Sequence, residues 1–277
     1  MNYDAKFGVS QGRLVESESG QLQCFPQSGW MKEFAIAEEA GLSFIELLIE
    51  RNVNKLNPFW SIDGRNKIKD LTLEHNLELY SCCFDYIIDH NLRKQDTKYK
   101  SILQDFFNAC DDLAIPVIVF PMLEESSLTK QNYKDFVPLI QDIADKFLCD
   151  SKELCIESIL PAAELADFLD RIDRNNVSCV YDTGNRVVDG TDLVCEIHLL
   201  NNRIKHFHIK DKNDGGENVI LGTGLVNFYE VFDALSSIAY KGHFNFETTR
   251  GRFPEKTIDL HLHIAKFFYE ELLNENT

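Results

Sequence analysis

Two polar motifs near the middle of the chain combine residue types that bind metal ions. Asp182-Thr183-Gly184-Asn185 follows the apolar run 177–181, and His206-Phe207-His208-Ile209-Lys210-Asp211 follows the short run 203–205. Both runs have the composition of strands, whereas apolar residues in the segment 190–201 recur at helical spacing. This order predicts two parallel strands joined by a crossover. Because α/β folds build active sites at the carboxyl ends of parallel strands, an aspartate and a histidine here could share a metal ion.

Two glutamates at the ends of further predicted strands are additional candidate metal ligands. Glu157 closes the run 154–157, and Glu247 closes the run 243–247. Taken singly, a carboxylate at a strand end is usually a solvated loop residue or a helix cap. Crowded carboxylates raise each other's pKa, however, and a divalent cation relieves their repulsion. Ligand residues that end four consecutive strands therefore predict one ion site, held by these residues: Glu157, Asp182, His208 and Glu247.

The two histidines of the second motif have different expected roles. Side chains alternate along a strand, so His206 and His208 lie on the same face, with His208 nearer to the mouth. We expect His208 to bind the ion, and His206 to lie deeper in the barrel with a hydrogen bond inside the core. Three carboxylates and one imidazole form an oxygen-rich site suited to Mn²⁺, Mg²⁺, Co²⁺ or Zn²⁺.

The elements that position these residues alternate along the whole chain. We predict strands over eight segments: 7–11, 44–49, 77–82, 116–120, 154–157, 177–182, 203–208 and 243–247. We predict helices over eight more: 30–40, 67–75, 97–114, 132–148, 161–174, 190–201, 228–237 and 255–273. No repeat or linker indicates a second domain, and barrels of this kind commonly run to about 250 residues. The expected fold is one (β/α)8 TIM barrel domain spanning residues 1–277.

Composition restricts the environment and the partners. With 45 acidic and 28 basic residues the net charge is −17, a field that repels polyanions, so nucleic acid is not an expected partner. No apolar run approaches the roughly 18 residues of a membrane helix, and the amino terminus lacks a signal-peptide pattern. We expect a cytoplasmic protein with no membrane partner, and a homo-oligomer is possible. The eight cysteines lack Cys-x-x-Cys spacing, so buried free thiols are expected rather than disulfides.

The motifs together resemble a known family. The similarity is to the xylose isomerase-like barrel superfamily of sugar isomerases and epimerases, which also contains the endonuclease IV type nucleases. These segments carry it: 8–14, 41–46, 156–157, 182–185, 206–211, 222–224 and 246–247. The resemblance implies a single divalent ion on the four ligands above, with Glu157 and Glu247 also transferring protons.

The sequence departs from two groups within that superfamily. Ketose 3-epimerases typically have histidine at the position of Asn185 and an arginine soon after the metal histidine, where this chain has 212–215 without arginine. These differences argue against 3-epimerisation of a free ketose. The nucleases need further histidines at the ends of strands three and four, where this chain has Cys82-Cys83 and Phe120-Pro121. Nuclease activity is therefore the least favoured alternative.

The chemistry that suits this site is proton abstraction next to a carbonyl. A metal ion would stabilise the enediolate that forms when one glutamate removes the carbon-bound proton. Glu157 and Glu247 could act as base and acid, giving epimerisation or aldose-ketose isomerisation. Lys210 is expected to place a positive group beside the developing charge; the alternative is a solvent-exposed lysine at a strand end.

The expected ligand is a small sugar or a sugar phosphate. Gly222 and Gly224 flank a turn that resembles a phosphate cradle, although such glycines can serve the backbone turn alone. Arg13 and Arg250 could meet an anion at the mouth, and Asn185 is a further candidate for substrate binding. The alternative to an enzyme is a sugar-binding barrel without catalysis. The sequence does not identify the sugar or whether it carries a phosphate, and it does not distinguish an isomerase from an epimerase. It also does not identify the native metal or the oligomeric state.

Overall fold

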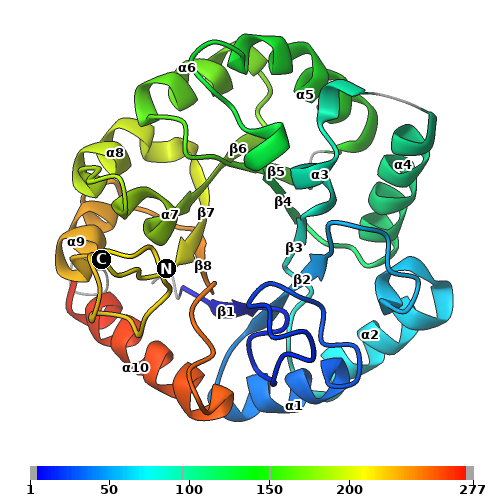
Figure 1. The fold of residues 1–277 in the computed structure, drawn as a ribbon, viewed down its shortest axis with the longest axis vertical. Coiled ribbons are helices and arrows are strands. Elements are labelled where there is room, and N and C mark those ends of the chain that lie inside the picture. The colour runs from blue at the N-terminus through cyan, green and yellow to red at the C-terminus, as the bar shows by residue number, and fades with distance from the viewer. Residues whose placement is uncertain (1–4, 95–96, 150, 273–277) are drawn as a thin grey trace.

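The strands close into a parallel barrel, as the sequence predicts. The computed structural model describes residues 5–94, 97–149 and 151–272, and within them eight strands pair in chain order, with β8 returning to β1 (Figure 1). The strands are β1 Phe7–Ser10, β2 Phe44–Ile49, β3 Ser81–Phe84, β4 Val117–Pro121, β5 Glu153–Glu157, β6 Val177–Asp182, β7 Ile204–Ile209 and β8 His243–Phe246. The (β/α)8 prediction is therefore confirmed.

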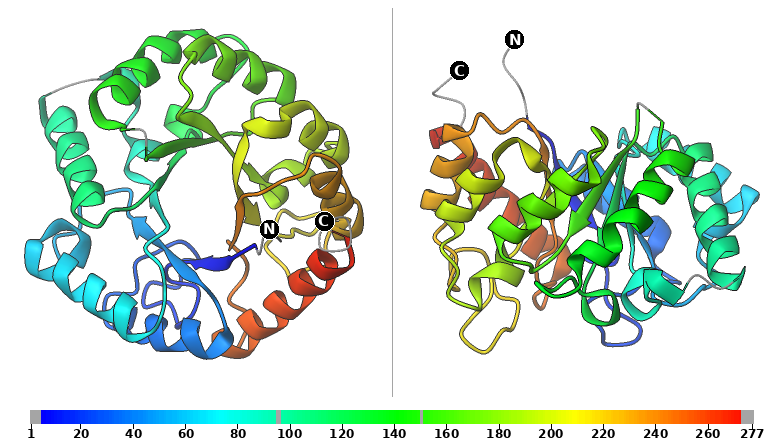
Figure 2. Two further views of the ribbon diagram at one scale, coloured as in Figure 1. Left: turned by 180° about the vertical axis from the view of Figure 1, so that it is seen from behind. Right: turned by 90° about the horizontal axis from the view of Figure 1, so that it is seen from above.

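Helices form the outer layer around the strands (Figure 2). They are α1 Trp30–Ala40, α2 Ile62–Glu74, α3 Tyr86–Asp89, α4 Thr97–Asp112, α5 Tyr133–Phe147, α6 Ala162–Ile172, α7 Thr183–Val187, α8 Leu193–Leu200, α9 Phe228–Ser237 and α10 Pro254–Leu272. Short 3-10 turns lie at Pro58–Trp60, Leu92–Lys94, Glu124–Ser126 and Asn201–Arg203. The prediction that eight strands alternate strictly with eight helices was wrong, because α3 and α7 are additional short helices after β3 and β6. Residue 273, the expected last helical residue, lies outside the described residues.

Six strands differ from their predicted bounds, five of them by one residue at one or both ends and β3 by four residues at its start. β3 begins at Ser81 rather than at residue 77, because the Leu77 amide still bonds the Thr72 carbonyl at the end of α2. β7 begins and ends one residue later than predicted, at Ile204 and Ile209. The shift of β3 brings Cys83 into the strand. Cys83 consequently faces the barrel interior, where it packs with Val119 and Val180.

The barrel interior changes from aromatic at its amino end to polar at its mouth. Rings of Phe44, Tyr80, His206 and His243 pack together, with Phe44 and Tyr80 centroids 4.9 Å apart and Tyr80 and His243 centroids 4.6 Å apart. The Phe44 ring lies directly over Gly8, where an added Cβ would come within 2.2 Å of it. These side chains fill the amino end of the barrel and leave the polar mouth at the carboxyl ends of the strands, where barrels of this kind bind ligands.

The eight cysteines, all at described positions, are free. Five of them are buried, as expected, but the expectation fails for Cys149 and Cys195, which are exposed, and for Cys24, which is half-buried. Cys149 lies beyond the end of α5, and Cys195 lies in the first turn of α8. Both positions place the thiol on the solvent side of the helical layer.

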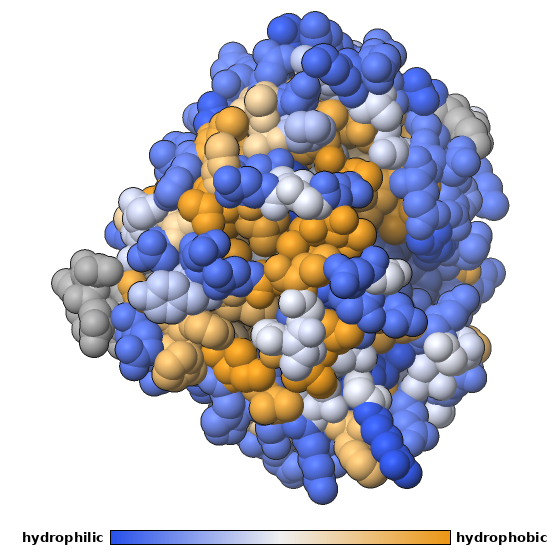
Figure 3. All heavy atoms as spheres, turned by 60° about the vertical axis from the view of Figure 1, so that its left-hand side comes forward, coloured by the Kyte–Doolittle hydropathy of each residue, from blue (hydrophilic) through white to orange (hydrophobic). Residues whose placement is uncertain are grey.

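One outer side of the barrel carries apolar surface. Figure 3 shows apolar side chains gathered on the side that Figure 1 places at its left, and the exposed apolar residues of α8, α9 and the loop before α9 are Leu199, Tyr229 and Leu225. A homo-oligomer remains a prediction that this surface does not test. No helix in the described part of the chain combines the length and the apolar character needed to cross a membrane.

Candidate metal centre at the barrel mouth

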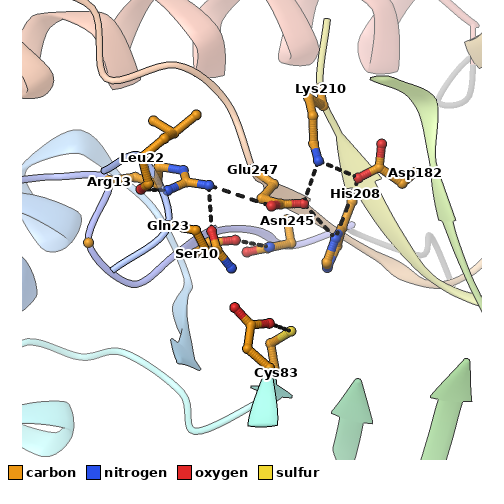
Figure 4. Close-up of polar contacts among 12 residues, drawn as sticks. Ser10, Arg13, Leu22, Gln23, Cys83, Asp182, His208, Lys210, Asn245 and Glu247 are labelled. Carbon is orange, nitrogen blue, oxygen red and sulfur yellow. Dashed lines mark hydrogen bonds and ion pairs between the residues drawn. The ribbon is translucent and has the colours of Figure 1, made fainter. Parts of the chain in front are cut away.

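The four predicted ligands meet at the carboxyl ends of β5 to β8. Figure 4 shows three of them, Asp182, His208 and Glu247. Glu157 and Asp182 are the last residues of β5 and β6, His208 is the last but one of β7, and Glu247 directly follows β8. Register places Asp182 beside His208 in the sheet. One ligand atom from each of the four lies within 4.8 Å of the others. The sequence-based grouping therefore corresponds to one cluster in space.

The His208 ring faces the three carboxylates with Nδ1. This nitrogen lies 3.3 Å from Glu247 Oε2 and 3.9 Å from an oxygen of each of Glu157 and Asp182. It has no hydrogen-bond partner among the described residues, although it is fully buried. Ligand atoms about 2.1 Å from a common ion lie roughly 3 to 4 Å from one another. The donor set and its spacing therefore fit a small divalent cation.

Lys210 is buried beside the same carboxylates. The alternative prediction, a solvent-exposed lysine at a strand end, was therefore wrong. Its Nζ lies 2.9 Å from Asp182 Oδ2 and 2.8 Å from Glu247 Oε2. Burial opposes its charge, but Asp182 and Glu247 outweigh burial and raise the pKa of Lys210. A Cβ at Gly184 would come within 2.6 Å of the lysine side chain, so this glycine makes room for it.

Asn185 links this lysine to Glu157. Its Nδ2 donates to Glu157 Oε1 at 2.8 Å, and its Oδ1 accepts from Lys210 Nζ and from Lys212 Nζ, each at 3.3 Å. Asp182 caps the short helix α7 by accepting from the Asn185 amide at 2.7 Å. The Asp182 to Asn185 turn thus positions a candidate ligand and the side chain that orients a second one.

The two glutamates differ in their electrostatic surroundings. Burial, followed by the charge of Glu247, raises the pKa of Glu157 to about 8. Burial also opposes ionisation of Glu247, but Lys210 and His208 outweigh it and hold the pKa of Glu247 well below its usual range. Neighbouring charges therefore favour a protonated Glu157 next to an ionised Glu247.

Glu46, on β2, is the principal residue that sequence reasoning missed. Its Oε2 lies 2.7 Å from His206 Nε2, and its Oε1 lies 3.1 Å from His208 Nε2. Asn245 supports it by donating to Glu46 Oε1 at 3.1 Å and to Ser10 Oγ at 2.8 Å. His206 is buried and hydrogen-bonded within the core, so that prediction is confirmed. The available signal was one acidic residue inside the apolar run 44–49.

Arg13 and Arg250, which were expected to bind an anionic ligand, have hydrogen-bond partners within the protein. Arg13 donates to the Leu22 carbonyl and to Gln23 Oε1 at 2.6 Å, and it lies 3.5 Å from Glu247 Oε1 (Figure 4). Arg250 donates to the carbonyls of Gly12, Gln21 and Leu22 at 2.5, 2.8 and 2.6 Å. Arg13 is thus beside the candidate site, whereas Arg250 fastens the loop after β1.

The glycine turn after β7 also has a different role from the expected one. Amides of Gly222 and Gly224 donate to Asp211 Oδ2 at 2.9 and 2.8 Å, and the Val226 amide donates to Asp211 Oδ1 at 3.1 Å. A Cβ at Gly224 would come within 2.4 Å of the Asp211 carboxylate. The backbone turn is therefore organised around Asp211, and the amides of Gly222 and Gly224 are not free to cradle a phosphate.

Comparison with known proteins agrees with this architecture. The family model for the xylose isomerase-like TIM barrel matches residues 34–267. The chain therefore belongs to the xylose isomerase-like TIM barrel family.

Relatives in that family carry several activities. An L-ribulose-5-phosphate 3-epimerase of Salmonella heidelberg is 23% identical over 79% of this chain and 81% of its own length. An inosose dehydratase of Geobacillus thermodenitrificans is 31% identical, but the match covers 30% of this chain and 34% of the dehydratase. The structure of a Methylomonas D-allulose 3-epimerase in complex with D-allulose aligns with a TM-score of 0.73 at 20% identity, over 97% of this chain and 99% of that one. At this identity the structural likeness establishes the fold.

Proposed function

We propose that the protein is a divalent-metal-dependent sugar isomerase or epimerase that abstracts a proton next to a carbonyl. The observation that carries this proposal is the cluster of Glu157, Asp182, His208 and Glu247 around one point at the barrel mouth, in which the first three are buried and Glu247 is partly buried. Their residue types and spacing suit an ion of the Mn²⁺, Mg²⁺, Co²⁺ or Zn²⁺ class. Family membership and the sugar epimerases among the relatives support the same reaction class.

The chain's own residues would divide the work as follows. Bound to the four ligands, the ion would polarise a substrate carbonyl. Glu157 and Glu247 extend from β5 and β8, so they reach the same substrate from different parts of the barrel wall. One would remove the proton beside the carbonyl, and the other would return a proton to a different face or carbon. Lys210 and Arg13, both in contact with Glu247, would hold that carboxylate in position.

Dehydration is a second candidate because of the similarity to inosose dehydratases. Its first step, loss of a proton beside a carbonyl, is the same, but a neighbouring hydroxyl then leaves as water. The product therefore separates the two candidates, since an isomerase or epimerase keeps the substrate mass. A sugar-binding barrel without catalysis would bind a ligand and exchange no proton.

Deuterium incorporation tests the proposal directly. Metal-loaded protein is incubated in deuterated water with D-fructose, D-allulose, L-ribulose and their phosphates. At least one sugar should gain deuterium on the carbon beside its carbonyl. Glu157→Gln and Glu247→Gln should each slow this incorporation by at least about a hundredfold, the lower end of what a positioned acid or base contributes.

Metal content is measured in every preparation, because the two glutamates are also candidate ligands. A variant that keeps its metal and loses exchange supports the proton-transfer role. Unchanged exchange in both variants would contradict that role. Bound metal and bound sugar without exchange in the parent protein would favour the binding barrel.

A further inference from the structure

A large cavity of about 900 Å³ lies beside the candidate site, and the proposed reaction does not need it. It is lined by the loops that follow β1 and β2, together with Asp85 and Asp89 after β3. The cavity that holds the catalytic candidates is smaller, about 190 Å³. Gln23, Arg51 and Asp85 line both cavities, so the two adjoin at these residues. We call the smaller cavity, which contains Glu157 and Glu247, the inner cavity, and the larger one the outer cavity.

The outer cavity has the lining of a site for an uncharged polyhydroxylated group. Its walls combine carboxylates and amides, which bind hydroxyls, with the apolar faces of Phe25 and Val53. Its polar residues include Glu18, Gln21, Gln27, Glu50, Asn52 and Asn54. Such a mixture offers both donors and acceptors, together with surface for the carbon skeleton of a sugar.

The same lining disfavours a phosphate. Among the described residues around the outer cavity, Arg51 is the one lysine or arginine, and its charge is already paired. Arg51 bonds Asp89 at 2.9 Å and both oxygens of Glu124 at 2.7 and 2.5 Å. An anion would meet the carboxylates of Glu18 and Glu50 without a free cation to offset them.

The wall formed by the loop after β1 is fastened to the barrel. Arg250 bonds three carbonyls of this loop, and the buried Glu33 carboxylate accepts from the Gly12 and Leu14 amides at 2.8 and 3.2 Å. Arg13 holds Gln23 at 2.6 Å, which fixes one of the three residues between the cavities. The outer cavity is thus bounded by a loop with many fixed contacts, so it is a built feature of the barrel mouth.

Asp85 is placed to contact a ligand that spans both cavities. It is buried, it lines both, and Cys83 Sγ donates to its Oδ1 at 3.3 Å. Burial raises the pKa of Asp85 to about 6, so near neutral pH this carboxyl can be present in either protonation state. In both states it can bind a sugar hydroxyl, as acceptor or as donor.

We propose that the substrate is a ketose unit carrying a second uncharged sugar or polyol unit, with the ketose in the inner cavity and the second unit in the outer cavity. This inference rests on the proposed function, because it places the reacting carbonyl beside Glu157 and Glu247. At about 190 Å³ the inner cavity is smaller than the roughly 300 to 1,000 Å³ of sites for drug-sized ligands, so it suits one small unit. The outer cavity, at about 900 Å³, has room for the other.

Paired substrates test the inference. Deuterium incorporation beside the carbonyl is measured with metal-loaded protein for D-fructose, for D-fructose 6-phosphate, and for isomaltulose, lactulose and turanose, which join a glucosyl or galactosyl unit to fructose. We expect kcat/KM for at least one disaccharide to exceed that for D-fructose by tenfold or more. D-fructose 6-phosphate should be poorer than D-fructose.

A bulky residue in the outer cavity should remove this preference. Val53→Trp, in the loop after β2, should lower the ratio of disaccharide to D-fructose kcat/KM by about tenfold. Leu56→Trp is the matched control, because Leu56 is exposed in the same loop and does not line the outer cavity. It should keep the parent ratio, and circular dichroism checks that both variants are folded.

The outcomes separate the two proposals. Exchange that is as efficient with D-fructose as with every disaccharide, or most efficient with the phosphate, would overturn the two-cavity inference and leave the proposed function intact. An equal decrease in the ratio of disaccharide to D-fructose kcat/KM in Val53→Trp and Leu56→Trp would also overturn it. No exchange with any of these sugars by metal-loaded protein would contradict the proposed function, and the inference with it.

Discussion

Glu46 bridges two histidines of β7, with one carboxylate oxygen 2.7 Å from His206 Nε2 and the other 3.1 Å from His208 Nε2. This contact determines which nitrogen of His208 is available at the mouth. When Nε2 carries its proton toward Glu46, the Nδ1 lone pair points at the carboxylates of the candidate metal centre. Histidines that bind metals commonly donate their other nitrogen to a carboxylate in this way. Glu46 is therefore a positioning residue for His208.

The first prediction concerns this bridge. Glu46→Gln removes the carboxylate charge beside His208 and replaces one of the two oxygens that face the histidines with an NH₂ group. We expect affinity for Mn²⁺ to fall by about 10- to 100-fold, the usual effect of losing such an outer partner. Titration calorimetry measures it, with the exposed Glu74→Gln on α2 as the control. Parent-like affinity in Glu46→Gln would show that His208 is oriented without Glu46.

The second prediction concerns the ion itself. His208→Ala or Asp182→Ala removes one of four donors and should abolish stoichiometric binding of a divalent ion, measured by elemental analysis after equilibration with Mn²⁺ or Zn²⁺. His263→Ala, an exposed histidine on α10, should bind like the parent. Retention of one tightly bound ion in both site variants would place the metal at another site.

The third prediction separates two neighbouring arginines. Arg250→Ala removes the hydrogen bonds from Arg250 to three carbonyls of the loop after β1, so amides of residues 12–24 should exchange hydrogen faster. Arg252→Ala should leave this exchange unchanged, because Arg252 contacts the ring of Phe253, 5.5 Å from its centroid. Mass spectrometry of deuterated peptides compares the two. Equal protection of the loop in both variants would contradict the fastening role.

Part of this site could be predicted because local patterns determine it. Strand ends in a parallel barrel share one mouth, so Glu157, Asp182 and His208 could be grouped from the sequence once the strands were assigned. Alternation along β7 likewise distinguished His206 from His208. Neither step required knowledge of a distant contact.

The remainder depends on contacts between segments far apart in the chain. Glu46 and His206 are separated by 160 positions, and no local pattern indicates that they share a hydrogen bond. Nor does a sequence reveal that the donors of Arg250 bond loop carbonyls, or that Asp211 occupies the amides of Gly222 and Gly224. Composition indicates cations and glycines near the mouth, but only the three-dimensional arrangement shows which of them already have partners.

The last prediction concerns pH and Glu33 on α1. This side chain is 1% exposed; its Oε1 accepts from two loop amides, and its Oε2 has no hydrogen-bond partner among the described residues. Burial raises the pKa of Glu33 to about 7, against the opposing effect of those amides and of Arg250 and Arg13. Between the unfolded pKa of 4.5 and the folded value, the folded protein holds a proton that the unfolded chain has lost.

The free energy of unfolding must therefore decrease as pH rises through this window, by an amount on the order of 3 kcal/mol for this group alone. Glu33→Gln keeps the accepting oxygen and has no proton to lose, so it removes this contribution. Urea unfolding at pH 5, 6, 7 and 8 should show the variant gaining stability relative to the parent up to about pH 7 and then holding a constant difference. Glu39→Gln, exposed on the same helix, is the matched control and should track the parent. A difference between Glu33→Gln and the parent that does not change with pH would mean that Glu33 is ionised in the folded protein throughout this range.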